Sequence, residues 1–416
     1  MVISLALASL GAAGPLPERL DLRSALEAAA ERNPEIRAAN AQYLAMRERP
    51  IQEGTLPNPS LGIRYHNENW KESFGESEFS FVEVGAEQEI PFPGKLSLRG
   101  RIAEREAERE GAMRDLTVLM VLAATASSYA DLVVAERSAA ILQESHALLG
   151  FMVEQAAARY RVGESAQQDV LRASLERGGI DERLAMLERR RAAAAAALRA
   201  LLDLGEGQAL PPVEALPDSG PVEPLDALTG KLAARSPELH AAQEEILRSE
   251  AALRLARRDY YPDFAVMGSY MNKERLLPEW ELGVRLELPL YFWRRERAAL
   301  AEAGFAERAA AHAHRNTQRS LEGRLADFHA MAEASSRLLR LYGDRLVPEA
   351  RLTFESSRAS YGVGRVDFLT VLSAFTSLLE YRLRYEEENA NLVRALAEIG
   401  PIVGETPLGA PLGGAP

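Results

Sequence analysis

The sequence "YRVGESAQQDVL" at residues 160–171 returns in altered form as "YGVGRVDFLTVL" at residues 361–372. In both copies a tyrosine is followed three residues later by a glycine, and the downstream residues suit the start of a new helix. Glycine at a helix end supplies the left-handed backbone conformation with which many helices terminate. Each copy therefore predicts a tight turn between two antiparallel helices.

Three further landmarks repeat in the same order. "RNPEIRAAN" (32–40) matches "RSPELHAAQ" (235–243), and each begins a helix with proline and places glutamate in the first turn, where the helix dipole favours an acid. "LPNPSLGIRY" (56–65) matches "YPDFAVMGSY" (261–270), and "EVGAEQEIPFPG" (83–94) matches "ELGVRLELPLYF" (281–292). This self-similarity indicates that the chain is two copies of one unit.

The repeats predict a mainly α-helical fold with a small β part, in which each copy contributes a long antiparallel helical hairpin and a β-hairpin. Residues 96–150 contain no proline and predict one very long helix, with its partner expected at Arg294 to Val347. The expected domains are a first repeat at 14–204, a Pro/Gly linker at 205–224, a second repeat at 225–400 and a disordered tail at 401–416. We expect strands at about 60–67, 79–91, 264–272 and 280–291, and helical hairpins at 95–204 and 294–399.

The predicted strands alternate between apolar and polar residues. In 281–290 one face carries Leu282, Val284 and Leu286, and the other carries Glu281, Arg285 and Glu287. An apolar outer face and a charged inner face are typical of a membrane barrel with a wet lumen. A soluble sheet with one solvated face is the alternative. Because four strands cannot close a barrel, the barrel must be shared, and three copies would supply twelve strands.

Composition excludes several classes of function. The net charge of -12 argues against nucleic-acid binding, and the absence of cysteine excludes disulfides and thiolate chemistry. The six histidines are scattered, so we expect no metal site, and no nucleotide, dinucleotide or hydrolase motif predicts a cofactor or an enzyme. Residues 1–13 are apolar, end in small residues and predict an export signal. Beyond them, we expect no apolar stretch that approaches the ~20 residues of a membrane-spanning helix.

Duplication, element order and the paired "YxxG" turns together resemble the TolC family of outer-membrane efflux proteins. The resemblance implies a homotrimer with a shared twelve-stranded barrel in outer-membrane lipid and a long helical tunnel in the periplasm. It also implies two partners in a tripartite pump, a periplasmic adaptor (membrane fusion) protein and an inner-membrane transporter of the RND type. The strand end "QEIPFPGK" resembles members that serve heavy-metal resistance pumps.

The resemblance also suggests functional residues. The predicted gate at the periplasmic mouth consists of Asp169, Tyr361, Arg365, Asp367, Thr370 and Ser373, although Thr370 and Ser373 stand where the best-known member has aspartates. Adaptor contact is expected at Val162, Gly163, Val363 and Gly364. The barrel lumen is expected to be lined by Arg64, Glu83, Glu87, Arg285 and Glu287.

Other interpretations stay open at this point. The turn residues could be ordinary helix caps on a solvated surface. The long helices would also suit a soluble periplasmic coiled-coil or adaptor protein, although two alternating strand hairpins in duplicated halves are foreign to that class. A helical hydrolase has only solvent-facing acids in its favour.

Overall fold

The computed structural model describes residues 16–68, 70–205, 208–217, 220–407 and 409. The predicted export signal at 1–13 therefore lies outside the described residues. The first repeat folds as α1 (Leu22–Arg32), α2 (Pro34–Arg47), α3 (Arg49–Gly54), β1 (Ser60–His66), β2 (Phe81–Ile90), α4 (Lys95–Arg161) and α5 (Gln167–Leu201). The second folds as α6 (Leu225–Arg235), α7 (Pro237–Arg258), β3 (Asp263–Asn272), β4 (Glu279–Glu287), α8 (Arg295–Leu341), η1 (Tyr342–Leu346), α9 (Val347–Gly362) and α10 (Phe368–Val403).

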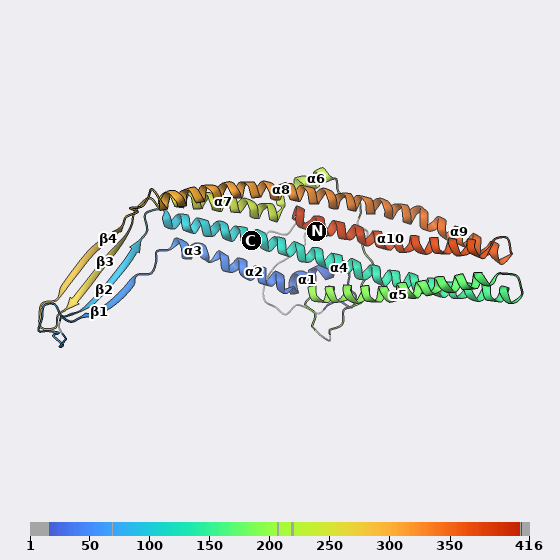
Figure 1. Ribbon diagram of the computed structural model, residues 1–416, viewed down its shortest axis with the longest axis horizontal. Coiled ribbons are helices and arrows are strands. Elements are labelled where there is room, and N and C mark those ends of the chain that lie inside the picture. The colour runs from blue at the N-terminus through green and yellow to red at the C-terminus, as the bar shows by residue number, and fades with distance from the viewer. Residues whose placement is uncertain (1–15, 69, 206–207, 218–219, 408, 410–416) are drawn as a thin grey trace. The chain divides into compact units, whose positions relative to one another are not determined.

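The chain divides into two compact units. The helical unit comprises residues 1–39, 114–238 and 319–416, and the sheet unit comprises residues 40–113 and 239–318. Both units take segments from both repeats. The expected combination of mostly helix with a small antiparallel sheet is confirmed (Figure 1).

The sheet unit contains one antiparallel sheet in the order β1-β2-β3-β4. The two hairpins have the same register, because aligning the repeats converts the pair Arg64↔Glu83 into the pair Ser269↔Glu281, and both pairs are present. β2 pairs with β3 and joins the two hairpins. The strands begin and end close to the predicted positions, except that β4 stops at Glu287, before the proline at 289.

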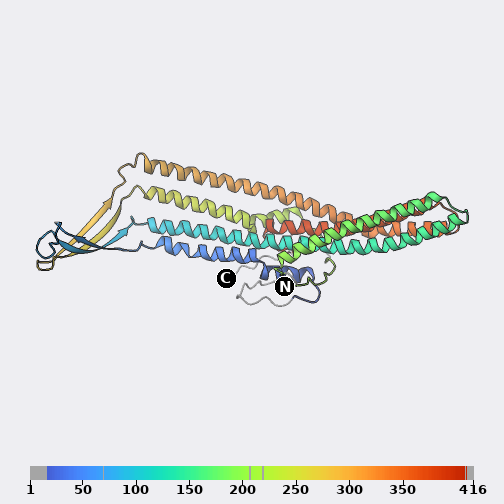
Figure 2. The ribbon, with the colours of Figure 1, turned by 60° about the horizontal axis from the view of Figure 1, so that its bottom comes forward.

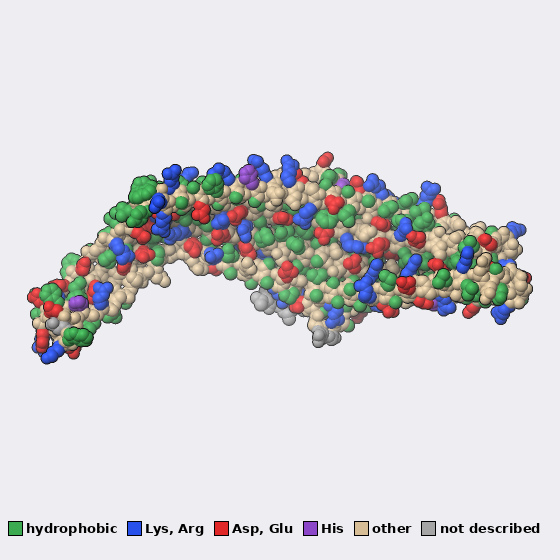
Figure 3. Space-filling view, in the orientation of Figure 1, with side chains coloured by type: hydrophobic (Ala, Val, Ile, Leu, Met, Phe, Trp, Pro, Cys, Tyr) green, Lys and Arg blue, Asp and Glu red, His purple; other side chains and the backbone are tan. Residues whose placement is uncertain are grey.

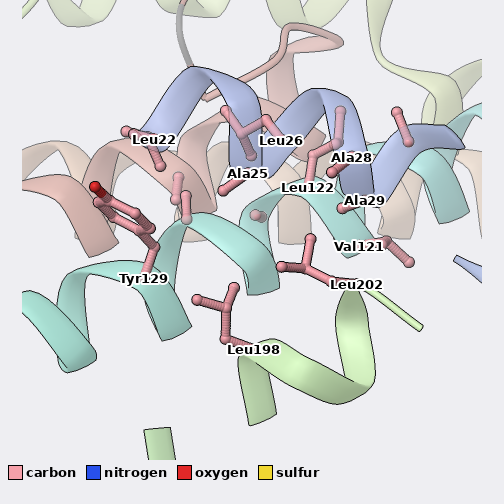
Figure 4. Packing of buried hydrophobic residues seen from close by; sticks show 14 of the residues in the cluster. Leu22, Ala25, Leu26, Ala28, Ala29, Val121, Leu122, Tyr129, Leu198 and Leu202 are labelled. Atoms are coloured by element: carbon pink, nitrogen blue, oxygen red, sulfur yellow. The ribbon is translucent and has the colours of Figure 1, made fainter. Parts of the chain in front are cut away.

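The helical unit is built around a core that α1 shares with α4 and the end of α5 (Figure 4). Asp21 begins α1 as its N-cap, where it accepts from the Ser24 N–H. Tyr129 of α4 is completely buried, and its hydroxyl donates to the carbonyl oxygen of either Leu20 (2.8 Å) or Glu214 (2.9 Å) while it accepts from the Glu214 N–H (3.1 Å). This hydroxyl fixes the start of α1 and the linker to α4.

Helix α4 corrects one expectation. It contains an 18-residue window that is long and apolar enough by composition to cross a membrane, so the prediction that no such stretch exists is wrong. In the structure 72% of this window is buried. Its apolar residues include Val118, Leu119, Val121 and Leu122, which lie in the protein interior. The apolar window therefore belongs to a helix that packs in the protein core.

The predicted long helix from Arg294 to Val347 is interrupted. α8 ends at Leu341, and a π-helical turn follows at Tyr342–Leu346, in which the Val347 N–H reaches back to the Tyr342 carbonyl. Pro348 stands at the start of α9 and has no N–H to continue the α-helical ladder. Proline therefore explains the interruption, and the sequence from Leu96 to Gly150, which lacks proline, continues unbroken in α4.

The predicted disordered tail is wrong for its first residues. α10 continues through Pro401 to Val403, and Ile402 and Val403 are buried. Glu405 then pairs with Lys231 at 2.9 Å and with Arg235 at 3.1 Å. The Gly- and Pro-rich composition suggested disorder, but apolar burial and these ion pairs hold the segment. Residues 408 and 410–416 lie outside the described part of the chain.

The two helical hairpins end in turns that pack on a second core. Figure 2 shows α4 beside α5 and α9 beside α10 as each pair approaches its turn. The buried members come from all of these helices and include Leu149, Met152, Ile180, Phe354, Phe368, Val371 and Phe375. This core positions the turns at 162–166 and 363–367 within the helical unit.

Candidate functional site

The two hairpin tips share one backbone design. The Gly163 N–H donates to the Tyr160 carbonyl (3.0 Å) and the Glu164 N–H to the Arg159 carbonyl (2.9 Å). The second tip repeats both bonds, from Gly364 to Tyr361 (3.0 Å) and from the next residue to Ser360 (2.9 Å). These bonds are those of the Schellman helix end. The repeated turn in the sequence is therefore a repeated turn in the structure.

The glycines at the tips are required by the backbone. Gly163 has φ +81° and Gly364 has φ +75°, a region that side chains with a Cβ rarely adopt. A Cβ at Gly163 would meet no atom within 4 Å, so conformation and not space selects glycine there. Val162 and Val363, immediately before them, are each 70% exposed. The two tips thus present matching apolar side chains, as the adaptor-contact prediction requires, and that role stays a prediction.

An arginine that the sequence did not single out connects the two tips. Arg159, in the last turn of α4, donates to the Tyr361 carbonyl oxygen (2.6 Å), and its guanidinium lies 4.6 Å from the centre of the Tyr361 ring. Arg159 also pairs with Glu164 at 3.4 Å. The one sequence signal for this contact is the position of Arg159 near a helix end, where a cation stabilises the terminal carbonyl groups.

Tyr361 is a packed residue. It is buried, and its ring meets Phe368 edge to face, with centroids 5.7 Å apart. Its hydroxyl is buried without a hydrogen-bond partner among the described residues. Its counterpart Tyr160 is 45% exposed, so the tyrosine that the sequence repeats is buried in one tip and exposed in the other.

The other predicted gate residues lie around the same two turns. Asp367 is the N-cap of α10 and accepts from the Thr370 N–H (2.9 Å) and the Thr370 hydroxyl. The hydrogen bonds from Thr370 lower the pKa of Asp367. Asp169 is half-buried in the first turn of α5, and the Ser373 hydroxyl donates to the Thr370 carbonyl (3.0 Å). Arg365 is exposed, and its side chain makes no ion pair with another residue in the described chain. These contacts are local, and gating by these residues stays a prediction.

The sheet separates polar from apolar side chains as predicted. Arg64 pairs with its cross-strand partner Glu83 at 3.1 Å, and Arg285 pairs with Glu87. By strand alternation Glu287 shares this polar face with Arg285. All five predicted lumen residues therefore lie on one face of the sheet.

The opposite face is apolar and uncovered in the single chain. It carries Leu61 and Ile63 on β1 and Leu282, Val284 and Leu286 on β4, all exposed. A soluble sheet would place such a face against a core. Surfaces of this kind mark contact with a membrane or another protein.

The described residues contain no cluster of three or more His, Asp or Glu side chains that could hold a metal ion. On the face that Figure 3 shows, acidic and basic side chains are mixed over the surface of the helices.

The family model described as "Outer membrane efflux protein" matches residues 25–203 and again residues 228–405. The chain belongs to the outer membrane efflux protein family.

Relatives of this outer membrane efflux protein extend over nearly its whole length. The cobalt-zinc-cadmium resistance protein CzcC of Cupriavidus metallidurans is 25% identical over 399 residues, which cover 94% of this chain and 91% of CzcC. The crystal structure of CusC has a TM-score of 0.80 at 17% identity and covers 96% of both chains. The outer membrane protein VceC of Vibrio cholerae has a TM-score of 0.77 at 17% identity, covering 92% of this chain and 96% of VceC. The two structures show a shared fold.

Family membership confirms the predicted exit duct and its place in the outer membrane. The family is one of outer-membrane channels, so the soluble adaptor interpretation is set aside. The exposed apolar face of the sheet agrees with this location.

Proposed function

We propose that three copies of this chain form a trimer whose sheets close into one twelve-stranded barrel in the outer membrane. The observation that supports the proposal is the sheet itself: one face is apolar and exposed, the other is charged, and the outer edges of β1 and β4 have no partner strand among the described residues. An unpaired edge cannot lie in lipid, because its backbone groups would lack hydrogen bonds. Closure through neighbouring copies satisfies both edges.

The trimer conducts substrate passively, and the energy comes from an inner-membrane transporter of the RND type. A periplasmic adaptor protein completes the tripartite pump by docking on the hairpin tips. Exposed Val162 and Val363, held on the two matching turns, support this docking. In a trimer, three pairs of tips would surround the mouth.

We place the gate at the same mouth, among Asp169, Tyr361, Arg365, Asp367, Thr370 and Ser373. Exposed ion pairs are typically worth under ~1 kcal/mol, so a latch of such pairs would need three symmetric copies and partial burial. Arg159 joins this set because it already binds the Tyr361 carbonyl within the chain.

The cargo that we propose is divalent metal ions. The name of the relative CzcC records resistance to cobalt, zinc and cadmium, and the similarity extends over 94% of this chain. Besides Glu83 and Glu87, which are paired with arginines, the polar sheet face carries Glu281 and Glu287, and this excess of acids would favour cations in the lumen.

Two measurements test the proposal. The protein should fractionate with the outer membrane and run as a trimer after detergent extraction, and a monomeric protein in the soluble fraction would refute the duct. A strain that lacks the gene should be more sensitive to cobalt, zinc and cadmium, with a drug panel as the comparison. Sensitivity to drugs alone would refute the metal assignment and leave the duct intact.

A further inference from the structure

The two repeats meet within the chain where β2 ends and β3 begins. Phe92, just after β2, stacks on Tyr261, just before β3, with ring centroids 4.6 Å apart and planes inclined by 13°. The Phe92 N–H donates to Asp263 (2.6 Å). Lys95, whose side chain is only 4% exposed, pairs with Asp263 at 2.9 Å and donates to the Tyr261 carbonyl (3.1 Å). We call these four residues the inner clasp.

The duplication places the counterparts of the inner clasp at the two outer edges of the sheet. Aligned repeats put Leu290, after β4, at the position of Phe92. They put Leu56, before β1, at the position of Tyr261, so an aromatic pair becomes an aliphatic pair. Within the chain Leu56 is 46% exposed and Leu290 is 65% exposed.

The charged half of the clasp has no counterpart at the outer edges. The position of Asp263 is occupied by Asn58, which carries no charge that could hold a buried cation. The turn after β4 is instead extended by the exposed aromatic residues 291–293. Figure 3 shows hydrophobic side chains gathered over this turn between β4 and α8. An outer junction built from these turns would be apolar.

The same alignment fixes a strand register between copies. The in-chain partners Ala86↔Gly268 of β2 and β3 become Val284↔Ile63 of β4 and a neighbour's β1. This register also puts apolar faces together, since Val284 and Ile63 both lie on the apolar face. A slip of one residue would mix the two faces.

We propose that β4 of one copy pairs with β1 of a neighbouring copy with Val284 opposite Ile63, and that Leu290 packs on the neighbour's Leu56 as an apolar outer clasp. The inference rests on the proposed trimer and adds its contact residues. A second copy is the occupant that the structure supports, because the inner clasp is a template for the contact and both sheet edges are open. The junctions around the ring then alternate between a charged clasp within each chain and an apolar clasp between chains.

Disulfide trapping of the full chain in outer-membrane vesicles tests the register, since the protein has no cysteine of its own. With Ile63→Cys and Val284→Cys in one chain, oxidation should produce covalent dimers and trimers on a denaturing gel. Within one chain the two positions are three strand spacings apart, roughly 14 Å, which is too far for a disulfide. The control Gly62→Cys with Val284→Cys points the thiols to opposite faces and should remain monomeric.

A second pair, Leu56→Cys with Leu290→Cys, tests the outer clasp with a short bismaleimide as the linker. Linked trimers from both pairs support the proposal. Trimers from the strand pair alone would overturn the clasp and retain the shared barrel. Labelling of the cysteine at 290 by a lipid-soluble maleimide, without linking, would assign that turn to the membrane instead. No linking by either pair, in a protein that still runs as a trimer in detergent, would refute the register and the outer clasp, whereas a monomer in detergent would refute the proposed trimer itself.

Discussion

Replacing Arg159 with alanine should loosen the two hairpin tips from each other. Arg159 belongs to the end of α4, and Tyr361 belongs to the end of α9, so their contact joins the two repeats. Removal of the guanidinium takes away the 2.6 Å hydrogen bond to the Tyr361 carbonyl and the charge over its ring. The alanine variant leaves both Schellman turns intact, because their bonds are made by the backbone.

The size of the effect follows from the contacts. A hydrogen bond from a charged donor contributes about 1.5–3 kcal/mol, and a cation–π contact whose cation keeps some contact with water contributes about 0.5–1 kcal/mol. The Arg159 side chain is 26% exposed, so the lower ends of both ranges apply and the sum is about 2 kcal/mol. The ion pair with Glu164, which is 62% exposed, adds little. Opening of the tip should become about 30-fold more frequent.

Native-state hydrogen exchange read by mass spectrometry measures this opening. Amides of residues 360–372 should lose about 30-fold protection in Arg159→Ala, and Arg159→Lys should fall between because it keeps the charge but not the planar fork. Arg365→Ala is the matched control, since the Arg365 side chain is exposed, and its protection should change about twofold or less. Unchanged protection in Arg159→Ala, or a larger loss in Arg365→Ala, would refute the reasoning.

Three further predictions follow from other parts of the helical unit. Tyr129→Phe removes the one hydroxyl proton available to the Leu20 and Glu214 carbonyls, although the Leu20 carbonyl keeps the Glu214 N–H as a donor (2.9 Å), and should lower the free energy of unfolding by about 0.5–1.5 kcal/mol, seen as a lower thermal midpoint in detergent; an unchanged midpoint would contradict the bridge. Burial raises the pKa of Glu386 above 4.5, so its contribution to stability falls as pH rises from 4.5 through the folded-state pKa; the stability gained by Glu386→Gln should grow over that interval, and a pH-independent difference would contradict it. Val162→Glu combined with Val363→Glu should abolish adaptor pull-down and leave the trimer intact, whereas unchanged capture would remove the tips from the docking surface.

The sequence contains enough information to predict the sheet and its faces. Alternation with a period of two assigns each strand residue to a face without reference to other strands, and the duplication supplies a second, independent reading of the same pattern. Arg64 and Arg285 were expected to share a face with Glu83 and Glu87, and the cross-strand register brings each arginine to one of these acids. The turns could be predicted equally well, because the positive φ at Gly163 and Gly364 requires glycine, and these glycines are visible in the sequence.

Contacts between distant segments could not be read in this way. The second repeat has serine at the position that corresponds to Arg159, so the comparison of repeats that predicted the turns could not single out this arginine. The ordered tail depends on Glu405 meeting Lys231 and Arg235, residues that become neighbours only after α6 packs beside α10. Local composition argued for disorder there, and tertiary burial prevailed.

In the proposed trimer, one face of the sheet meets lipid and the other meets the water of the lumen. Single cysteines at successive positions 282–287 in outer-membrane vesicles, treated with a charged maleimide, test it most directly, because the chain has no native cysteine. Labelling should follow a period of two, strong at 283, 285 and 287 and weak at 282, 284 and 286. Uniform labelling along the strand, or the opposite phase, would contradict it.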